Sequence, residues 1–176
     1  VLLNQIPSGS PVGKARLSSR FGKRIHPVTK VAKMHRGLDF AVNPGTKFYA
    51  PADGVVEVTR RSNKGSGNFL RLQHSFGFSS SYSHLKKFKV KSGQFVKKGQ
   101  LIAISGNSGL SSGPHLHYEE RFVGRALNLK PFVDWSLNDF EDIFTKERRI
   151  RWESLIKTVE QRVAQQLQLS SPKAVL

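Results

Sequence analysis

Glycine recurs every few residues across the middle of the chain and leaves room only for short elements. Ten glycines fall within residues 45–113, and β-branched or apolar runs lie between them. Regular turn signals without helical periodicity favour antiparallel β structure. The sequence therefore predicts a mainly β domain, built as an antiparallel sandwich or barrel-like sheet. The expected strands are Gly54–Arg60, Asn68–His74, Ser80–His84, Leu101–Ser105 and His115–Phe122.

The two ends of the chain differ from this β domain, which we expect to span residues 17–135. Residues 1–16 are rich in Pro, Ser and Gly, which predicts a linker or an extended arm. Residues 136–169 carry apolar side chains at helical spacing and predict an α-helical extension, followed by a flexible tail at 170–176. An isolated helix of this kind is marginal in water, so its apolar stripe must be buried against the β domain or a partner.

Composition restricts the partners and the metal ligands. The formal net charge of +17 predicts an anionic partner. Nucleic acid is not the expected one, because no RNP run, zinc knuckle or helix-turn-helix signature occurs. Cysteine is absent, which excludes disulfides and thiolate ligands. No apolar run is long enough to cross a membrane. Because the chain begins with Val1, we expect it to belong to a longer protein whose upstream part could supply a membrane anchor.

Two segments carry residues suited to metal binding. His115 and His117 lie two apart in an expected strand, which puts both imidazoles on one face, about 6.6 Å apart along the chain. His35 and Asp39 lie four apart, and a straight strand would separate them by roughly 13 Å. That separation is too large for one ion, and Gly37 disfavours a helix. A bend at Gly37 would bring the two side chains together.

Together the segments offer two imidazoles and a carboxylate, which suit a catalytic Zn²⁺ site with an open position for water. With His35 and Asp39 as ligands, one of His115 and His117 completes the set. The other is then available to act with His84 as an acid/base pair. His84 ends an expected strand, from which a loop could bring it toward the metal.

The order H-x-x-x-D, then Tyr-x-His-Leu, then Gly-Pro-His-Leu-His-Tyr-Glu resembles the lysostaphin/LytM-type zinc metallopeptidases, which are peptidoglycan endopeptidases with a duplicated hybrid motif-like β domain. The resemblance covers about Leu17 to Phe132. One departure is that residues 28–34 lack the tyrosine that some members carry. The other matching segments are Arg20-Phe21-Gly22 with His26-Pro27, Pro44-Gly45-Thr46, Ala50 to Val56, Gly93 to Ile102 and Gly106-Asn107-Ser108-Gly109.

The resemblance implies a role for each site residue. His35, Asp39 and His117 would hold one Zn²⁺ per chain, while His84 and His115 would be the catalytic histidines beside it. All five positions are intact here. The implied function is a zinc-dependent metalloendopeptidase that hydrolyses peptide stems or cross-links of bacterial cell-wall peptidoglycan, in cell-wall remodelling, cell shape or division. The alternative is a non-catalytic peptidoglycan-binding or activator module of the same family.

The expected location follows from the same resemblance, whereas the partner expected for the helical segment follows from that segment's own apolar stripe. A peptidoglycan substrate implies a periplasmic or extracellular protein associated with the cell envelope, and the positive charge suits that anionic surface. The helix expected at 136–169 could bind a second copy, a related peptidase-like chain or a membrane scaffold. A basic nucleic-acid-binding domain is permitted by charge alone, but it leaves the five site residues unexplained.

Overall fold

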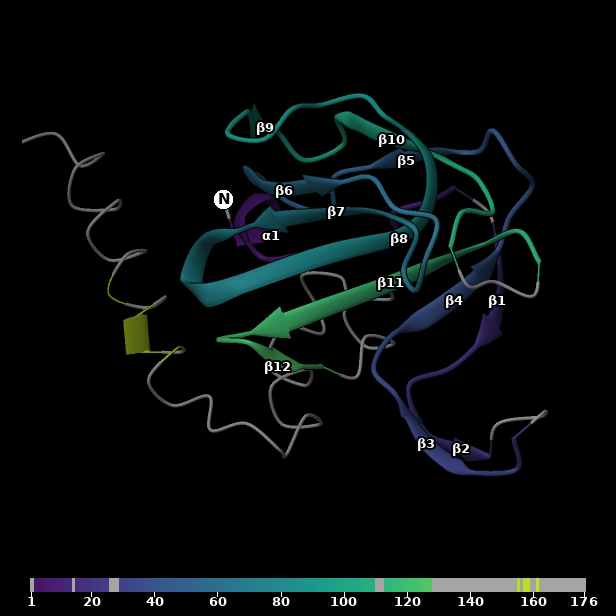
Figure 1. The fold of residues 1–176 in the computed structure, drawn as a ribbon. Helices are drawn as coiled ribbons and strands as arrows, with labels where there is room; N and C mark the ends of the chain where they lie inside the picture. The colour runs from purple at the N-terminus through teal and green to yellow at the C-terminus, as the bar shows by residue number, and fades with distance from the viewer. Residues whose placement is uncertain are drawn as a thin grey trace, which may run out of the picture.

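The computed structural model describes residues 2–13, 15–25, 29–109 and 113–127, together with the single positions 155, 157, 158 and 161 (Figure 1). The described part is mainly β, and every strand pairing in it is antiparallel. The prediction of an antiparallel β domain is therefore confirmed. No helix in the described residues is long and apolar enough to cross a membrane.

One ten-stranded sheet forms most of the domain, in the order β1-β4-β11-β8-β7-β6-β9, with β12 paired to β11. Strand β8 is long enough to pair first with β11 and β7 and then with β10, which leads on to β5. The strands are β1 Arg16–Ser19, β4 Leu38–Ala41, β5 Lys47–Tyr49, β6 Gly54–Arg60, β7 Asn68–Gln73, β8 Phe78–Phe88, β9 Phe95–Val96, β10 Leu101–Ser105, β11 His115–Phe122 and β12 Arg125–Ala126.

A separate two-stranded sheet, β2 Gly22–Ile25 with β3 Ala32–His35, extends beyond the ends of β1 and β4 (Figure 1). Ile25 and Met34 in this sheet, and Val31 just before β3, are exposed. The chain leaves β3 at His35, bends at Gly37 and enters β4 at Leu38, so the bend expected there is confirmed.

The first residues pack on the domain, which differs from the linker or extended arm expected over 1–16. They contain the short helix α1, Leu2–Gln5. The other helical element among the residues described before β11 is the 3₁₀ turn η1, Ser75–Gly77, which lies between β7 and β8. Ile6 and Val12 are buried in the same apolar cluster as Phe48 and Leu72. These apolar side chains explain the difference, because their burial outweighs the turn signals of the surrounding Pro, Ser and Gly.

The helical extension expected at 136–169 and the tail at 170–176 lie almost entirely outside the described residues. Four positions, 155, 157, 158 and 161, are described, and all four are helical. Leu155 is 5% exposed and belongs to the core cluster. Its burial favours packing of that position against the β domain, which is one of the two alternatives for this segment.

Strand β11 separates the core from the open face of the sheet. Leu116, Tyr118 and Glu120 are fully buried, while the alternate residues from His115 to Arg121 are only partly covered. This period of two is what a strand with one buried face requires. It confirms that His115 and His117 share a face, and it places Glu119 on that face as well.

Candidate active site

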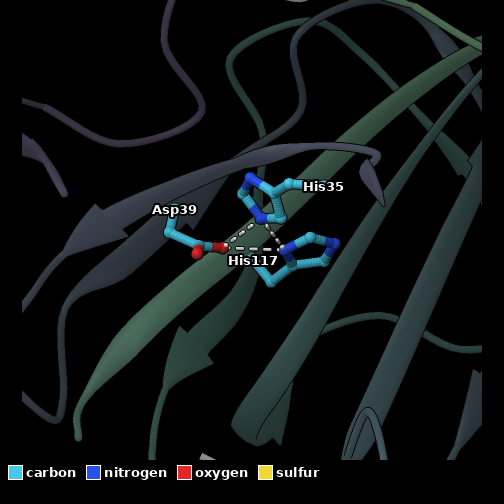
Figure 2. Close-up of side chains that lie close together, drawn as sticks. All are labelled: His35, Asp39 and His117. Carbon is cyan, nitrogen blue, oxygen red and sulfur yellow. Dashed lines mark hydrogen bonds and ion pairs between the residues drawn. The ribbon is translucent and has the colours of Figure 1, made fainter. Parts of the chain in front are cut away.

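His35, Asp39 and His117 converge at the junction of β3, β4 and β11 (Figure 2). Asp39 and His117 are direct cross-strand partners, and the bend at Gly37 returns His35 to the same point. Asp39 Oδ1 lies 2.7 Å from His117 Nδ1 and 3.2 Å from His35 Nε2. One ligand atom from each residue lies within 4.8 Å of the others. The three predicted ligands are therefore brought together.

Gly37 is required where β4 begins, because the chain there passes directly over β11. A Cβ atom at this position would overlap the carbonyl oxygen of Tyr118 and come within 3.0 Å of the His117 ring. Any larger residue would push β4 away from β11. The glycine that permits the bend thus also sets the spacing between Asp39 and His117.

The hydrogen bonds determine which nitrogen of each histidine faces the centre. His35 Nδ1–H donates to the carbonyl oxygen of Arg20 at 2.6 Å, so its Nε2 carries the lone pair in the neutral ring. His117 shows the opposite arrangement, since its Nε2–H donates to Glu119 Oε1 at 2.9 Å and its Nδ1 faces Asp39. The centre thus presents Nε2 of His35, Nδ1 of His117 and Oδ1 of Asp39.

Glu119 contacts the candidate ligand His117 and was not included among the site residues in the sequence interpretation. Its second oxygen accepts hydrogen bonds from Arg121 Nη2 at 3.0 Å and Nε at 3.2 Å. The carboxylate therefore holds the His117 ring while the guanidinium holds the carboxylate. A carboxylate behind a ligating histidine fixes its tautomer and increases its basicity. The signal was available, because residues 117, 119 and 121 alternate onto one face of the expected strand.

The electrostatics of the metal-free centre favour a protonated His117 beside ionised Asp39. Burial alone would lower the pKa of His117, but hydrogen bonds to Asp39 and Glu119 outweigh it and raise the pKa to about 9. Burial would likewise raise the pKa of Asp39, and the hydrogen bonds from His117 and His35 instead hold it well below its usual range. The site is therefore preorganised around a negative carboxylate.

His84 and His115 form a second pair next to this centre. Their ring centroids are 4.7 Å apart. His84 Nδ1–H donates to the carbonyl oxygen of Ser108 at 2.7 Å, and His115 Nδ1–H donates to that of Gly113 at 2.8 Å. Nε2 therefore carries the lone pair of each neutral ring. Burial lowers the pKa of His84 more than the Ser108 carbonyl raises it.

The expectation that His84 ends a strand is wrong, because β8 continues to Phe88. A bulge brings His84 to the site instead: Leu85 pairs with Asn68 and Tyr82 with Leu70, which leaves two residues of β8 opposite one of β7. His84 has φ of 62°, a left-handed conformation that is costly for a non-glycine residue. Strain of this kind is often retained at functional sites.

Two tightly packed loops hold His84 in this conformation. Its backbone N–H donates to the carbonyl oxygen of Ser66, while the Ser108 carbonyl holds its ring. Ser108 Oγ donates to the carbonyl oxygen of Leu85 at 2.6 Å. A Cβ at Gly109, which has φ of 78°, would overlap the backbone of Gly67. The contact between the loops depends on glycine at that point.

The remaining histidines are accounted for separately. His74, interpreted from the sequence as structural, is buried and hydrogen-bonds the carbonyl oxygen of Asp53 and the hydroxyl of Ser80. Its burial lowers its pKa to about 4, although Asp53 acts in the opposite direction. His26 lies outside the described residues.

Comparison with known proteins identifies this arrangement. The profile described as peptidase family M23 matches residues 33–129, more than half of the chain and all five of these site residues. The chain belongs to peptidase family M23. The M23 chain is 47% identical over 116 residues to the peptidoglycan DD-endopeptidase ShyA of Vibrio cholerae, covering 65% of this chain and 27% of ShyA. It therefore spans about a quarter of that relative.

Solved structures of M23 peptidases show the same similarity. A zinc-containing peptidase from Vibrio cholerae matches with a TM-score of 0.67 and 37% identity, covering 76% of this chain and 41% of that one. The catalytic domain of lysostaphin from Staphylococcus simulans matches with a TM-score of 0.62 and 32% identity, covering 69% of this chain and 93% of that one. The resemblance to lysostaphin-type peptidases is confirmed.

Proposed function

We propose that this M23 chain is a zinc-dependent metalloendopeptidase that hydrolyses peptide stems or cross-links of bacterial cell-wall peptidoglycan. The observation that carries the proposal is the convergence of two groups on one face: the ligand set His35, Asp39 and His117, and the histidine pair His84 and His115. Peptidoglycan as substrate is taken from relatives such as ShyA.

The donor set fits zinc. Two imidazole nitrogens and one carboxylate oxygen, with no cysteine in the chain, match catalytic zinc sites that leave a position for water. Zn²⁺ bound by these three residues would polarise the scissile carbonyl and lower the pKa of a bound water to about 7.

The chain's own residues supply the proton transfers and the orientation. His84 and His115 each hold an N–H toward a backbone carbonyl, so their Nε2 atoms take a proton from water and return one to the departing amine. Glu119, held by Arg121, keeps His117 in the tautomer that directs Nδ1 to the centre. The lowered pKa of buried His84 keeps its ring neutral at physiological pH and ready to accept a proton.

Location and assembly complete the proposal. A peptidoglycan substrate puts the protein in the periplasm or outside the cell, and the net charge of +17 favours the anionic envelope. We also propose that residues 136–169 bind a second copy, a related peptidase-like chain or a membrane scaffold.

The proposal is tested by incubating the zinc-loaded protein with purified sacculi, with and without chelator, followed by mass analysis of released muropeptides. We expect release that stops with chelator and returns when zinc is added. The His84→Ala variant should bind zinc and release little. Protein that binds sacculi and zinc without releasing any muropeptide would instead favour the non-catalytic activator.

A further inference from the structure

Arg24, on strand β2 of the projecting hairpin, reaches the carboxylate of the metal centre. Its Nη1 lies 3.8 Å from Asp39 Oδ2 and donates a 2.6 Å hydrogen bond to Ser19 Oγ. The oxygen that Arg24 faces is not the one used at the centre, because Oδ1 is the atom nearest His35 and His117. Among the described residues, Arg24 is the only lysine or arginine paired with Asp39.

The rest of the Arg24 guanidinium is available to a ligand. Its two contacts both use Nη1, and no hydrogen bond to Nε or Nη2 occurs within the part of the chain that the structure describes. The side chain is 46% exposed. Nε–H and Nη2–H lie side by side in the guanidinium plane and match the two oxygens of a carboxylate. Arg24 is thus anchored by one nitrogen and presents a carboxylate-binding edge.

The peptide bonds of peptidoglycan are of two kinds, according to whether a free carboxylate or another amide follows the bond. In a bond between two D-centres at the end of a stem or in a direct cross-link, the carbon attached to the scissile nitrogen also carries a free carboxylate. Within a stem or a glycine bridge, the same position is followed by another amide. The first kind places a negative charge immediately beyond the bond to be cut, close to where the metal centre would hold the carbonyl.

We propose that Arg24 binds a free α-carboxylate on the residue whose nitrogen is released, and thereby selects bonds that are followed by such a carboxylate. This inference rests on the proposed hydrolysis of peptidoglycan and defines which of its bonds the site accepts. A charge-assisted bidentate pair in a partly dry site favours the acid over the amide by about tenfold to a hundredfold.

A positioning role for Arg24 makes a different prediction. If the guanidinium only oriented Asp39, its removal would weaken zinc binding or turnover equally for every substrate. The ratio of kcat/KM for an acid substrate to that for its amide is insensitive to such a loss, because both values come from the same zinc-loaded variant. This ratio therefore distinguishes substrate recognition from positioning.

The experiment uses the full chain loaded with zinc and two synthetic stem peptides that end in D-Ala–D-Ala, one with a free carboxylate and one with a carboxamide. Wild-type protein should prefer the acid by about tenfold to a hundredfold in kcat/KM. Arg24→Gln should bring the ratio close to one, and Arg24→Lys should keep part of the preference. The matched control is Lys23→Gln, which removes the same charge from the neighbouring position, on the opposite side of the strand.

Equal cleavage of the two peptides by wild type, or an unchanged ratio in Arg24→Gln, would overturn the inference. If wild type cleaves neither peptide nor sacculi, the proposed function fails instead, and calorimetric binding of the two peptides then decides the role of Arg24. Tighter binding of the acid that is lost in Arg24→Gln supports it, and equal binding overturns it. Zinc content and thermal melting verify folding, and Arg24→Lys replaces Arg24→Gln if the latter does not fold.

Discussion

Zinc binding should expel a proton from His117. In the metal-free protein both ring nitrogens face carboxylates, Nδ1 toward Asp39 at 2.7 Å and Nε2 toward Glu119 at 2.9 Å. Burial opposes the charge on this ring, but the two carboxylates prevail and raise its pKa to about 9. A metal can bind Nδ1 only after that nitrogen loses its proton, so zinc and proton compete for one position.

The size of this competition follows from the pKa. At pH 7, two units below it, about 1% of molecules have the Nδ1 position free, so the apparent zinc affinity is about a hundredfold weaker than above pH 9. The difference corresponds to about 3 kcal/mol. Because the proton is bound below pH 9 and lost above it, the apparent zinc affinity should rise about tenfold from pH 7 to pH 8.

Calorimetric titration of zinc into the metal-free protein, in buffers of equal pH and different ionisation enthalpy, counts the protons released. We expect at least one per zinc at pH 7. Glu119→Gln removes one of the two carboxylates that hold the proton, so at pH 8 it should release fewer protons than wild type. An affinity that does not change with pH between 7 and 8, or equal proton release from both proteins at pH 8, would refute the reasoning.

Five further variants test single positions. Asp39→Ala should lose zinc and activity together, whereas His84→Ala should keep zinc, by elemental analysis, and lose about 10²–10⁴-fold in kcat. Glu119→Ala should weaken zinc binding about 10–100-fold in a chelator competition assay above pH 9, where the proton no longer competes and only the loss of the carboxylate that orients His117 remains. Gly109→Ala should reduce kcat with zinc content unchanged, because its Cβ displaces the loop that holds His84. Burial raises the pKa of Glu120 to about 8, so its protonated form adds to the free energy of unfolding below pH 4.5, and this contribution is lost as pH rises to 8. In urea unfolding at pH 8, Glu120→Gln should therefore have a free energy of unfolding up to about 5 kcal/mol higher than wild type.

The strands that could be predicted from the sequence are those with alternating apolar residues between glycine turns. The expected ranges for β6, β10 and β11 match the observed ones, and β7 differs by one residue. Hairpin β2–β3 could not be predicted, because most of its residues are exposed and neither strand alternates between buried and exposed positions. Its pairing depends on backbone hydrogen bonds, which leave no pattern in the side chains.

Five residues of the candidate site could be named from the sequence, whereas Glu119 was missed and the geometry was less predictable. Spacing alone placed His115 and His117 on one face and required the bend between His35 and Asp39, both of which the structure confirms. The choice of Nδ1 or Nε2 depends on partners distant in sequence, such as the Arg20 carbonyl, and no local pattern reveals them. The bulge at His84 likewise arises from a register shift between two strands.

The architecture separates the chemistry of the site from the proposed recognition of substrate. Asp39, His84, His115 and His117 lie on the central strands β4, β8 and β11, whose opposite faces are sealed by core residues such as Leu116. Arg24 lies instead on the exposed hairpin β2–β3, whose last residue, His35, is the one candidate ligand outside the central strands. Rotamers anchored in a packed sheet hold metal ligands within narrow limits, whereas an exposed hairpin tolerates substitution at little cost to the core. Exchange of residues on β2, and on β3 before His35, should therefore alter which peptide bonds are accepted while the metal centre and its histidine pair remain unchanged.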